Sequence, residues 1–73
     1  MYFKRIKDLR EDKDKIQEDI SKILKITRQQ YSLYETGKRD IPVDLLIDLA
    51  NYYDTSIDYI TERTNKKEPY PRR

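Results

Sequence analysis

Two helical segments separated by only three residues constrain this sequence more than any other feature. The first segment spaces its apolar side chains at helical intervals and ends near Leu24. Lys25, Ile26 and Thr27 interrupt the pattern, and a second helical pattern occupies Arg28–Glu35. Two helices joined by so short a connection meet at a steep angle, which leaves one face of the second helix free to enter a groove.

The second segment has a packing side and a side of polar side chains. At about 100° per residue, Tyr31, Tyr34 and Glu35 fall together. Thr27 is a good N-cap, because its hydroxyl can accept from a free amide of the first turn. Arg and Gln side chains match guanine and adenine edges in the major groove, and an exposed Leu fits a thymine methyl. The outward side carries these residue types, with Arg28, Gln29, Ser32, Leu33 and Thr36.

A wider set of spaced residues surrounds these segments. Its members are Gln17, Ile20, Leu24, Ile26, Thr27, Tyr31, Tyr34, Glu35, Gly37, Lys38, Arg39, Leu46, Leu49, Ala50, Ser56, Ile57, Asp58, Tyr59 and Ile60. As a set, this pattern is far more specific than any single piece. It resembles the helix-turn-helix transcriptional regulators of the phage repressor and Cro type, over approximately residues 3–60.

The resemblance implies an all-α fold, a compact five-helix bundle of the phage repressor DNA-binding domain type, with double-stranded DNA as the partner. Its recognition helix is Arg28–Glu35, and the protein is a transcriptional regulator, most simply a repressor that occupies an operator. The positions that read bases in family members are Arg28, Gln29 and Leu33. The positions expected to hold the DNA backbone are Gln17, Thr27, Ser32, Lys38 and Arg39.

Two contacts within the domain also follow from the resemblance. Gln17 is expected to bond a phosphate and to brace the neighbouring side chain of Arg28. Arg10 and Glu35 match a pair that in some members forms a salt bridge between the first helix and the end of the recognition helix. We expect that salt bridge here.

Three residues depart from the common pattern. Ile16 replaces the Thr or Ser that usually caps the first motif helix, so we expect the cap from Asp14 or from solvent. Ser21 replaces a small Ala, and its hydroxyl can bond the backbone four residues earlier. Lys25 stands where Gly is common, and a left-handed non-glycine residue costs roughly 1 kcal/mol.

The remaining elements follow from local signals. Helices are expected over residues 3–11 and 43–53, the second following Pro42, which suits a helix start. Ser56 is expected to cap a last helix. Gly37 is the only glycine, and as a left-handed residue it would end the recognition helix and turn Lys38 and Arg39 back toward the DNA.

Length and charge set wider limits. A chain of 73 residues forms one domain, expected over residues 1–63, with a basic, proline-containing and flexible tail over 64–73. The ending, with Tyr70 between two prolines, resembles that of small stand-alone regulators, so we expect a complete protein. Residues 1–39 carry a net charge of +4, residues 40–62 of −6 and residues 63–73 of +4. Such polarity orients a protein toward a phosphate backbone, although solvated helix surfaces explain much of it equally well.

One small module buries too little surface to select its site in a genome, so regulators of palindromic sites bind as dimers. We therefore expect a homodimer. The side chains that lie off the predicted core stripes, and are candidates for that contact, are Ile47, Tyr52 and Tyr59.

Several functions are disfavoured by the composition. The chain has no His and no Cys, and it contains no glycine-rich phosphate loop, so we expect no enzyme, no metal, no cofactor and no small-molecule substrate. It lacks an apolar run of membrane length and a signal-peptide core, so we expect a cytoplasmic protein with no membrane partner. The alternative is a protein-interaction module on the same fold, such as an antitoxin or anti-repressor adaptor, for which an outward Leu33 is the main argument.

Overall fold

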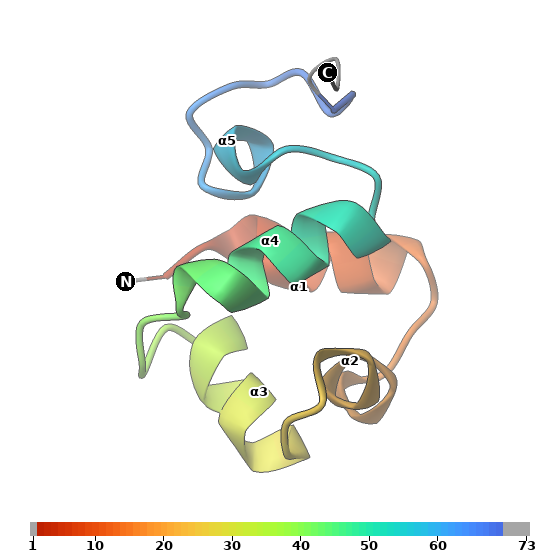
Figure 1. Ribbon diagram of the computed structural model, residues 1–73, viewed down its shortest axis with the longest axis vertical. Helices are drawn as coiled ribbons and strands as arrows, with labels where there is room; N and C mark the ends of the chain where they lie inside the picture. The colour runs from red at the N-terminus through yellow and green to blue at the C-terminus, as the bar shows by residue number, and fades with distance from the viewer. Residues whose placement is uncertain (1, 70–73) are drawn as a thin grey trace.

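The computed structural model describes residues 2–69, and in that range it contains five α-helices and no strand (Figure 1). The expected all-helical fold of five helices is confirmed. The predicted helices over residues 3–11 and 43–53 differ from the observed ones by no more than one residue at either end. The helices are α1 (Lys4–Asp12), α2 (Gln17–Leu24), α3 (Arg28–Glu35), α4 (Val43–Tyr52) and α5 (Ile57–Ile60).

Each helix contributes one completely buried side chain to a single core. These side chains are Ile6, Ile20, Tyr31, Leu49 and Ile60, all 0% exposed. Burial of one such side chain stabilises the fold by roughly 1.5–3 kcal/mol. In Figure 1, α2 and α3 pack together at one end of the long axis, and α5 packs on α1 and α4 toward the other. The motif helices therefore lie at one end of the domain.

Two helix starts are capped as the sequence predicts. The Gln30 N–H donates to Thr27 Oγ1 (3.1 Å), and the Tyr59 N–H donates to Ser56 Oγ (3.0 Å). Gln30 also returns its side chain to the Thr27 N–H (3.1 Å), which completes a capping box. This reciprocal bond fixes where α3 begins.

The start of α2 is capped differently from the prediction. The expected acceptor Asp14 is not used; instead the Ile16 N–H donates to the Asp19 carboxylate (3.1 Å). A full capping box has two hydrogen bonds, and one of them needs an acceptor in the N-cap side chain. Ile16 has no such acceptor, so only the bond from its backbone N–H to Asp19 can form. Ser21 also differs, because its hydroxyl donates to the Glu18 carbonyl (2.8 Å), three residues earlier and not four.

Gly37 adopts the left-handed backbone expected at the end of α3, with φ of +77°. The residue also packs closely against the start of the chain. A Cβ at position 37 would lie 2.8 Å from the Tyr2 Cβ and 2.9 Å from the Tyr2 Cα. Glycine therefore serves two purposes here, because it permits the turn and allows the backbone of Tyr2 to approach.

Replacing Gly37 by alanine should lower the free energy of unfolding by roughly 2–3 kcal/mol, from backbone strain plus overpacking against Tyr2. Urea denaturation followed by circular dichroism measures the loss. Gly37→Asn separates the two causes, since Asn adopts the left-handed backbone more readily but meets Tyr2 in the same way. If Gly37→Ala were as stable as the wild type, neither backbone strain nor overpacking against Tyr2 could operate at this position.

Candidate nucleic-acid interface

The turn between α2 and α3 is closed by two backbone hydrogen bonds. Lys25 is left-handed, with φ of +60°, and its N–H donates to the Lys22 carbonyl (3.2 Å). The Ile26 N–H donates to the Ser21 carbonyl (3.0 Å). This Schellman arrangement satisfies two of the free carbonyls at the end of α2. Thr27 then starts α3 at once, so α3 crosses α2 steeply; Figure 1 shows α2 nearly end-on beside α3.

α3 buries one side and presents the other, as its sequence predicts. Tyr31, Tyr34 and Glu35 are buried. Arg28 and Gln29 are exposed on the first turn of the opposite side. That side continues with Ser32 and Leu33, which are half-buried, and Thr36, which is exposed. The presented surface is therefore mainly polar, and less of Leu33 reaches solvent than the sequence predicts.

The loop after α3 presents two further cations. The Gly37 N–H donates to the Tyr34 carbonyl (3.2 Å), and the Arg39 N–H donates to the Leu33 carbonyl (3.2 Å). These bonds attach the loop to the last turn of α3. Lys38 and Arg39 are exposed, and neither forms a salt bridge within residues 2–69. Both side chains are thus available to an anionic partner beside the polar face of α3.

A partly buried ion pair joins α1 to the end of α3. Arg10 Nε donates to Glu35 Oε2 (2.8 Å), and Arg10 Nη2 donates to Glu35 Oε1 (3.0 Å). The two side chains are 12% and 3% exposed. Gln17 Nε2 also donates to Glu35 Oε1 (3.2 Å), whereas the family resemblance implied a contact with Arg28. The network therefore fixes the first residue of α2 relative to the recognition helix.

The protonation of Glu35 reflects two opposing effects. Burial raises its pKa, but hydrogen bonds, first that from Arg10, lower it more, so the pKa lies below the usual value. The hydroxyl of Tyr31 is buried beside this carboxylate without a hydrogen bond of good geometry, and burial raises the pKa of the phenol. Glu35 is therefore ionised and Tyr31 neutral at neutral pH.

The exposed groups on α3 and on the loop after it are of the kinds that contact nucleic acids. Within residues 2–69, no three His, Cys, Asp or Glu side chains lie close enough to hold a metal ion. In the same range, no helix has the length and apolar character needed to span a membrane. Arg and Gln donors on a helix, flanked by Lys and Arg on a loop, are the groups that contact base edges and phosphates.

Comparison with known proteins agrees with this geometry. The sequence profile of the helix-turn-helix family HTH_3 matches residues 6–60, most of the chain. The chain belongs to this helix-turn-helix family. The matched range contains all five helices except the start of α1. Classification as a DNA-binding regulator, predicted from the spaced residues, is thereby supported at the level of the family.

Three relatives from Bacillus subtilis (strain 168) have similar sequences. The uncharacterized HTH-type transcriptional regulator YobD is 33% identical over 94% of this chain and 62% of its own length. The regulator YqaE, similarly named, is 34% identical over 92% of this chain and 59% of its own length. The SPbeta prophage-derived uncharacterized HTH-type transcriptional regulator YonR is 34% identical over 89% of this chain and 60% of its own length. The chain thus spans about three fifths of each relative, and no solved structure matches it significantly.

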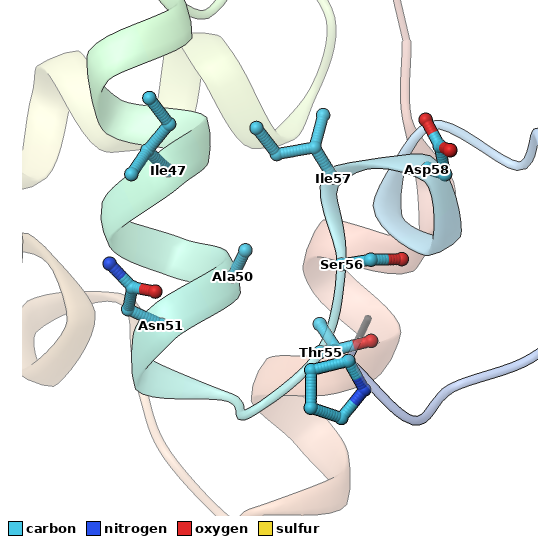
Figure 2. A pocket seen from close by; sticks show the side chains of 8 residues that line it. Ile47, Ala50, Asn51, Thr55, Ser56, Ile57 and Asp58 are labelled. Atoms are coloured by element: carbon cyan, nitrogen blue, oxygen red, sulfur yellow. The ribbon is translucent and has the colours of Figure 1, made fainter. Parts of the chain in front are cut away.

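The helix-turn-helix domain also has a groove between α4 and α5, of about 280 Å³. In Figure 2, Ala50 on α4 points toward the segment that carries Ile57, and Ile47 and Asn51 on the same helix also line the groove. Ile47, which the sequence assigned to a dimer contact, is 44% exposed on the rim of this groove. The other lining residues are Thr55, Ser56, Asp58 and Pro69.

The two tyrosines assigned to the same contact have partners within the domain. The Arg5 guanidinium lies over the Tyr59 ring, 4.2 Å from its centroid. The Lys13 ammonium lies over the Tyr52 ring at 5.3 Å. Both rings are half-buried and pack on the core. Of the three predicted contact residues, Ile47 therefore offers the most exposed apolar surface.

The segment after α5 touches the domain at two places. Arg5 Nη1 donates to the Thr64 carbonyl (2.7 Å), and Arg5 Nη2 donates to Asn65 Oδ1 (2.9 Å). The Thr55 hydroxyl donates to the Lys67 carbonyl (2.5 Å). Residues 64–67 are thus hydrogen-bonded to α1 and to the loop before α5. The predicted Tyr70 ending lies outside the described residues, so the flexibility expected of 64–73 stays a prediction.

Proposed function

We propose that this helix-turn-helix protein is a sequence-specific regulator that represses transcription by occupying an operator. The observation that carries the proposal is the first turn of α3. There Arg28 and Gln29 project from a helix whose opposite side is anchored in the core. Side chains on a rigid helix can enter the major groove without further ordering of the backbone.

Base reading is assigned to Arg28, Gln29 and Leu33. Arg28 suits guanine O6 and N7, Gln29 suits adenine N6 and N7, and Leu33 suits a thymine methyl. The half-buried position of Leu33 still allows apolar contact at the bottom of the groove. Backbone contacts are assigned to the polar and basic side chains around this face, which are Gln17, Thr27, Ser32, Lys38 and Arg39.

We further propose that two copies act together on a palindromic site, each reading one half-site. The α4–α5 groove is the surface assigned to the second copy, because Ile47 and Ile57 border it. Figure 1 places α5 at the end of the long axis away from α2 and α3, so this surface stays free when α3 binds DNA. Tyr52 and Tyr59 keep their assignment to the dimer contact through the parts of their half-buried side chains that remain exposed.

The mechanism is occupancy and involves no chemical step or cofactor. A repressor bound across a promoter excludes polymerase, and its effect depends on affinity and site selectivity. Such a protein acts where the DNA is, in the cytoplasm of a bacterial cell. The protein-interaction alternative has less support, since the outward face of α3 is mainly polar and Leu33 is partly buried.

Arg28→Ala and Lys38→Ala should weaken DNA binding in different ways. Loss of Arg28 should cost roughly 1–3 kcal/mol on the operator and relax the preference at one base pair. Loss of Lys38, a phosphate contact, should weaken all sequences alike. Fluorescence anisotropy on the operator and on single-base variants measures both. Equal losses on every sequence for both variants would remove the base-reading assignment from Arg28.

A further inference from the structure

We propose that a pocket between α1 and the ends of α2 and α3 binds a phosphate of the DNA backbone, with Lys7 and Tyr2 as contacts. This rests on the proposed DNA-binding function and adds a site to it. The pocket measures about 370 Å³. Its lining residues are Tyr2, Lys7, Arg10, Gln17, Glu35 and Thr36.

The pocket is rich in unused hydrogen-bond donors. A guanidinium has five N–H donors, and Arg10 uses three of them, two on Glu35 and one on the Lys15 carbonyl (2.8 Å). Gln17 gives Glu35 only one of its two amide hydrogens. Lys7 is exposed and forms no salt bridge within residues 2–69. Donors from three side chains therefore remain for a ligand.

The single carboxylate in the pocket does not repel an anion strongly. Glu35 is paired with Arg10 through both oxygens, and Gln17 shares one of them. The charge of the ion pair cancels, so the ammonium of Lys7 sets the net charge of the lining at +1. A positively charged pocket with free N–H and O–H donors favours an acceptor-only anion, and a phosphate diester has this chemistry.

The position of the pocket makes a DNA phosphate the best ligand. Tyr2 packs directly on Gly37, so it lies next to the loop that carries Lys38 and Arg39. Gln17 lines the same pocket and is already assigned to the DNA backbone. Glu35 and Thr36, at the end of α3, line the pocket together with Lys7, so a phosphate bound there would belong to a strand that flanks the groove entered by α3. Tyr2 and Lys7 would thus extend the backbone contacts onto α1.

The salt dependence of DNA binding tests this assignment. The logarithm of the association constant falls with the logarithm of salt concentration, with a slope of about −0.9 per phosphate contacted. Lys7→Gln should reduce the magnitude of the slope by about 1 and weaken binding at low salt roughly tenfold. Tyr2→Phe should weaken binding a few-fold without changing the slope. Lys66→Gln, in the segment beyond α5, is the matched control and should keep the wild-type slope.

Each outcome has a distinct meaning. An unchanged slope for Lys7→Gln, with a wild type that binds DNA, would overturn the phosphate pocket and leave the proposed function intact. Absence of DNA binding by the wild type would overturn both. The pocket could instead bind a free phosphate ion. To test this, inorganic phosphate is titrated into the protein at constant ionic strength, with chloride as the control anion, and binding is followed by NMR amide shifts. Millimolar binding that depends on Lys7, with an unchanged DNA slope, would assign the pocket to a free anion and contradict the proposal.

Discussion

Glu35→Ala is expected to lower the free energy of unfolding by up to about 3–5 kcal/mol, because it leaves the Arg10 side chain, only 12% exposed, without its charged partner. The whole stability of a domain this small is of similar size, so most of the variant should be unfolded near 37 °C. Thermal and urea denaturation measure the loss. A change below about 1 kcal/mol would show that the ion pair between α1 and α3 behaves as a surface pair.

A paired substitution controls for loss of packing. Arg10→Met combined with Glu35→Leu removes both charges and keeps apolar volume, so it should recover much of the lost stability. The same double variant should bind DNA more weakly than wild type, since Gln17 loses the oxygen that positions it. Recovery of stability together with full DNA affinity would contradict a role for Glu35 in positioning Gln17.

The ion pair also predicts the pH dependence of stability. Folding lowers the pKa of Glu35, so the pair contributes fully above the unfolded-state value near 4.5. The contribution is lost as the pH falls through the lower folded-state pKa. Wild type should therefore lose stability more steeply than Glu35→Gln below about pH 5. Parallel profiles for the two proteins would exclude Glu35 as the titrating group.

Ile47→Asp is expected to reduce affinity for a palindromic operator by about 100-fold, while affinity for an isolated half-site stays near the wild-type value. When two copies are joined in a dimer, binding of the first copy to its half-site holds the second copy close to the other half-site. This linkage typically raises affinity 10²–10⁴-fold over that of a single copy. A carboxylate at the rim of the α4–α5 groove would have to be buried unpaired between two copies. Equilibrium binding to full and half sites measures the difference.

The control variant for this interface is Ile23→Asp, since Ile23 is 39% exposed on α2 and lines no part of the groove. Sedimentation equilibrium without DNA should show weaker self-association for Ile47→Asp only. Equal self-association of Ile47→Asp and wild type would place the second copy elsewhere. A wild type that stays monomeric on a palindrome would contradict the homodimer itself.

Local signals explain what could be predicted from the sequence. Thr27, Ser56 and Gly37 act within one turn of their own position, so a helix start or end follows from residue type and spacing. The buried side of α3 follows in the same way from helical periodicity. These features set the five helices and the orientation of the recognition face.

The remaining features depend on side chains that meet only in the folded chain. Tyr52 and Tyr59 lie off the helical core stripes, yet Lys13 and Arg5 cover them from other segments. Gln17 turns to Glu35 because the end of α3 packs near the start of α2. The pocket around Lys7 combines three helices and Tyr2, so no stretch of sequence contains its pattern.

Selection of bound DNA from a pool of random duplexes at two salt concentrations tests the central claim most directly. We predict enrichment of a palindrome, bound with an affinity that falls steeply as salt rises, because an operator reader combines base contacts with phosphate contacts. Salt-sensitive binding with no enriched sequence would contradict base reading by α3. Absence of binding at low salt would contradict DNA as the partner and favour a protein partner on the same fold.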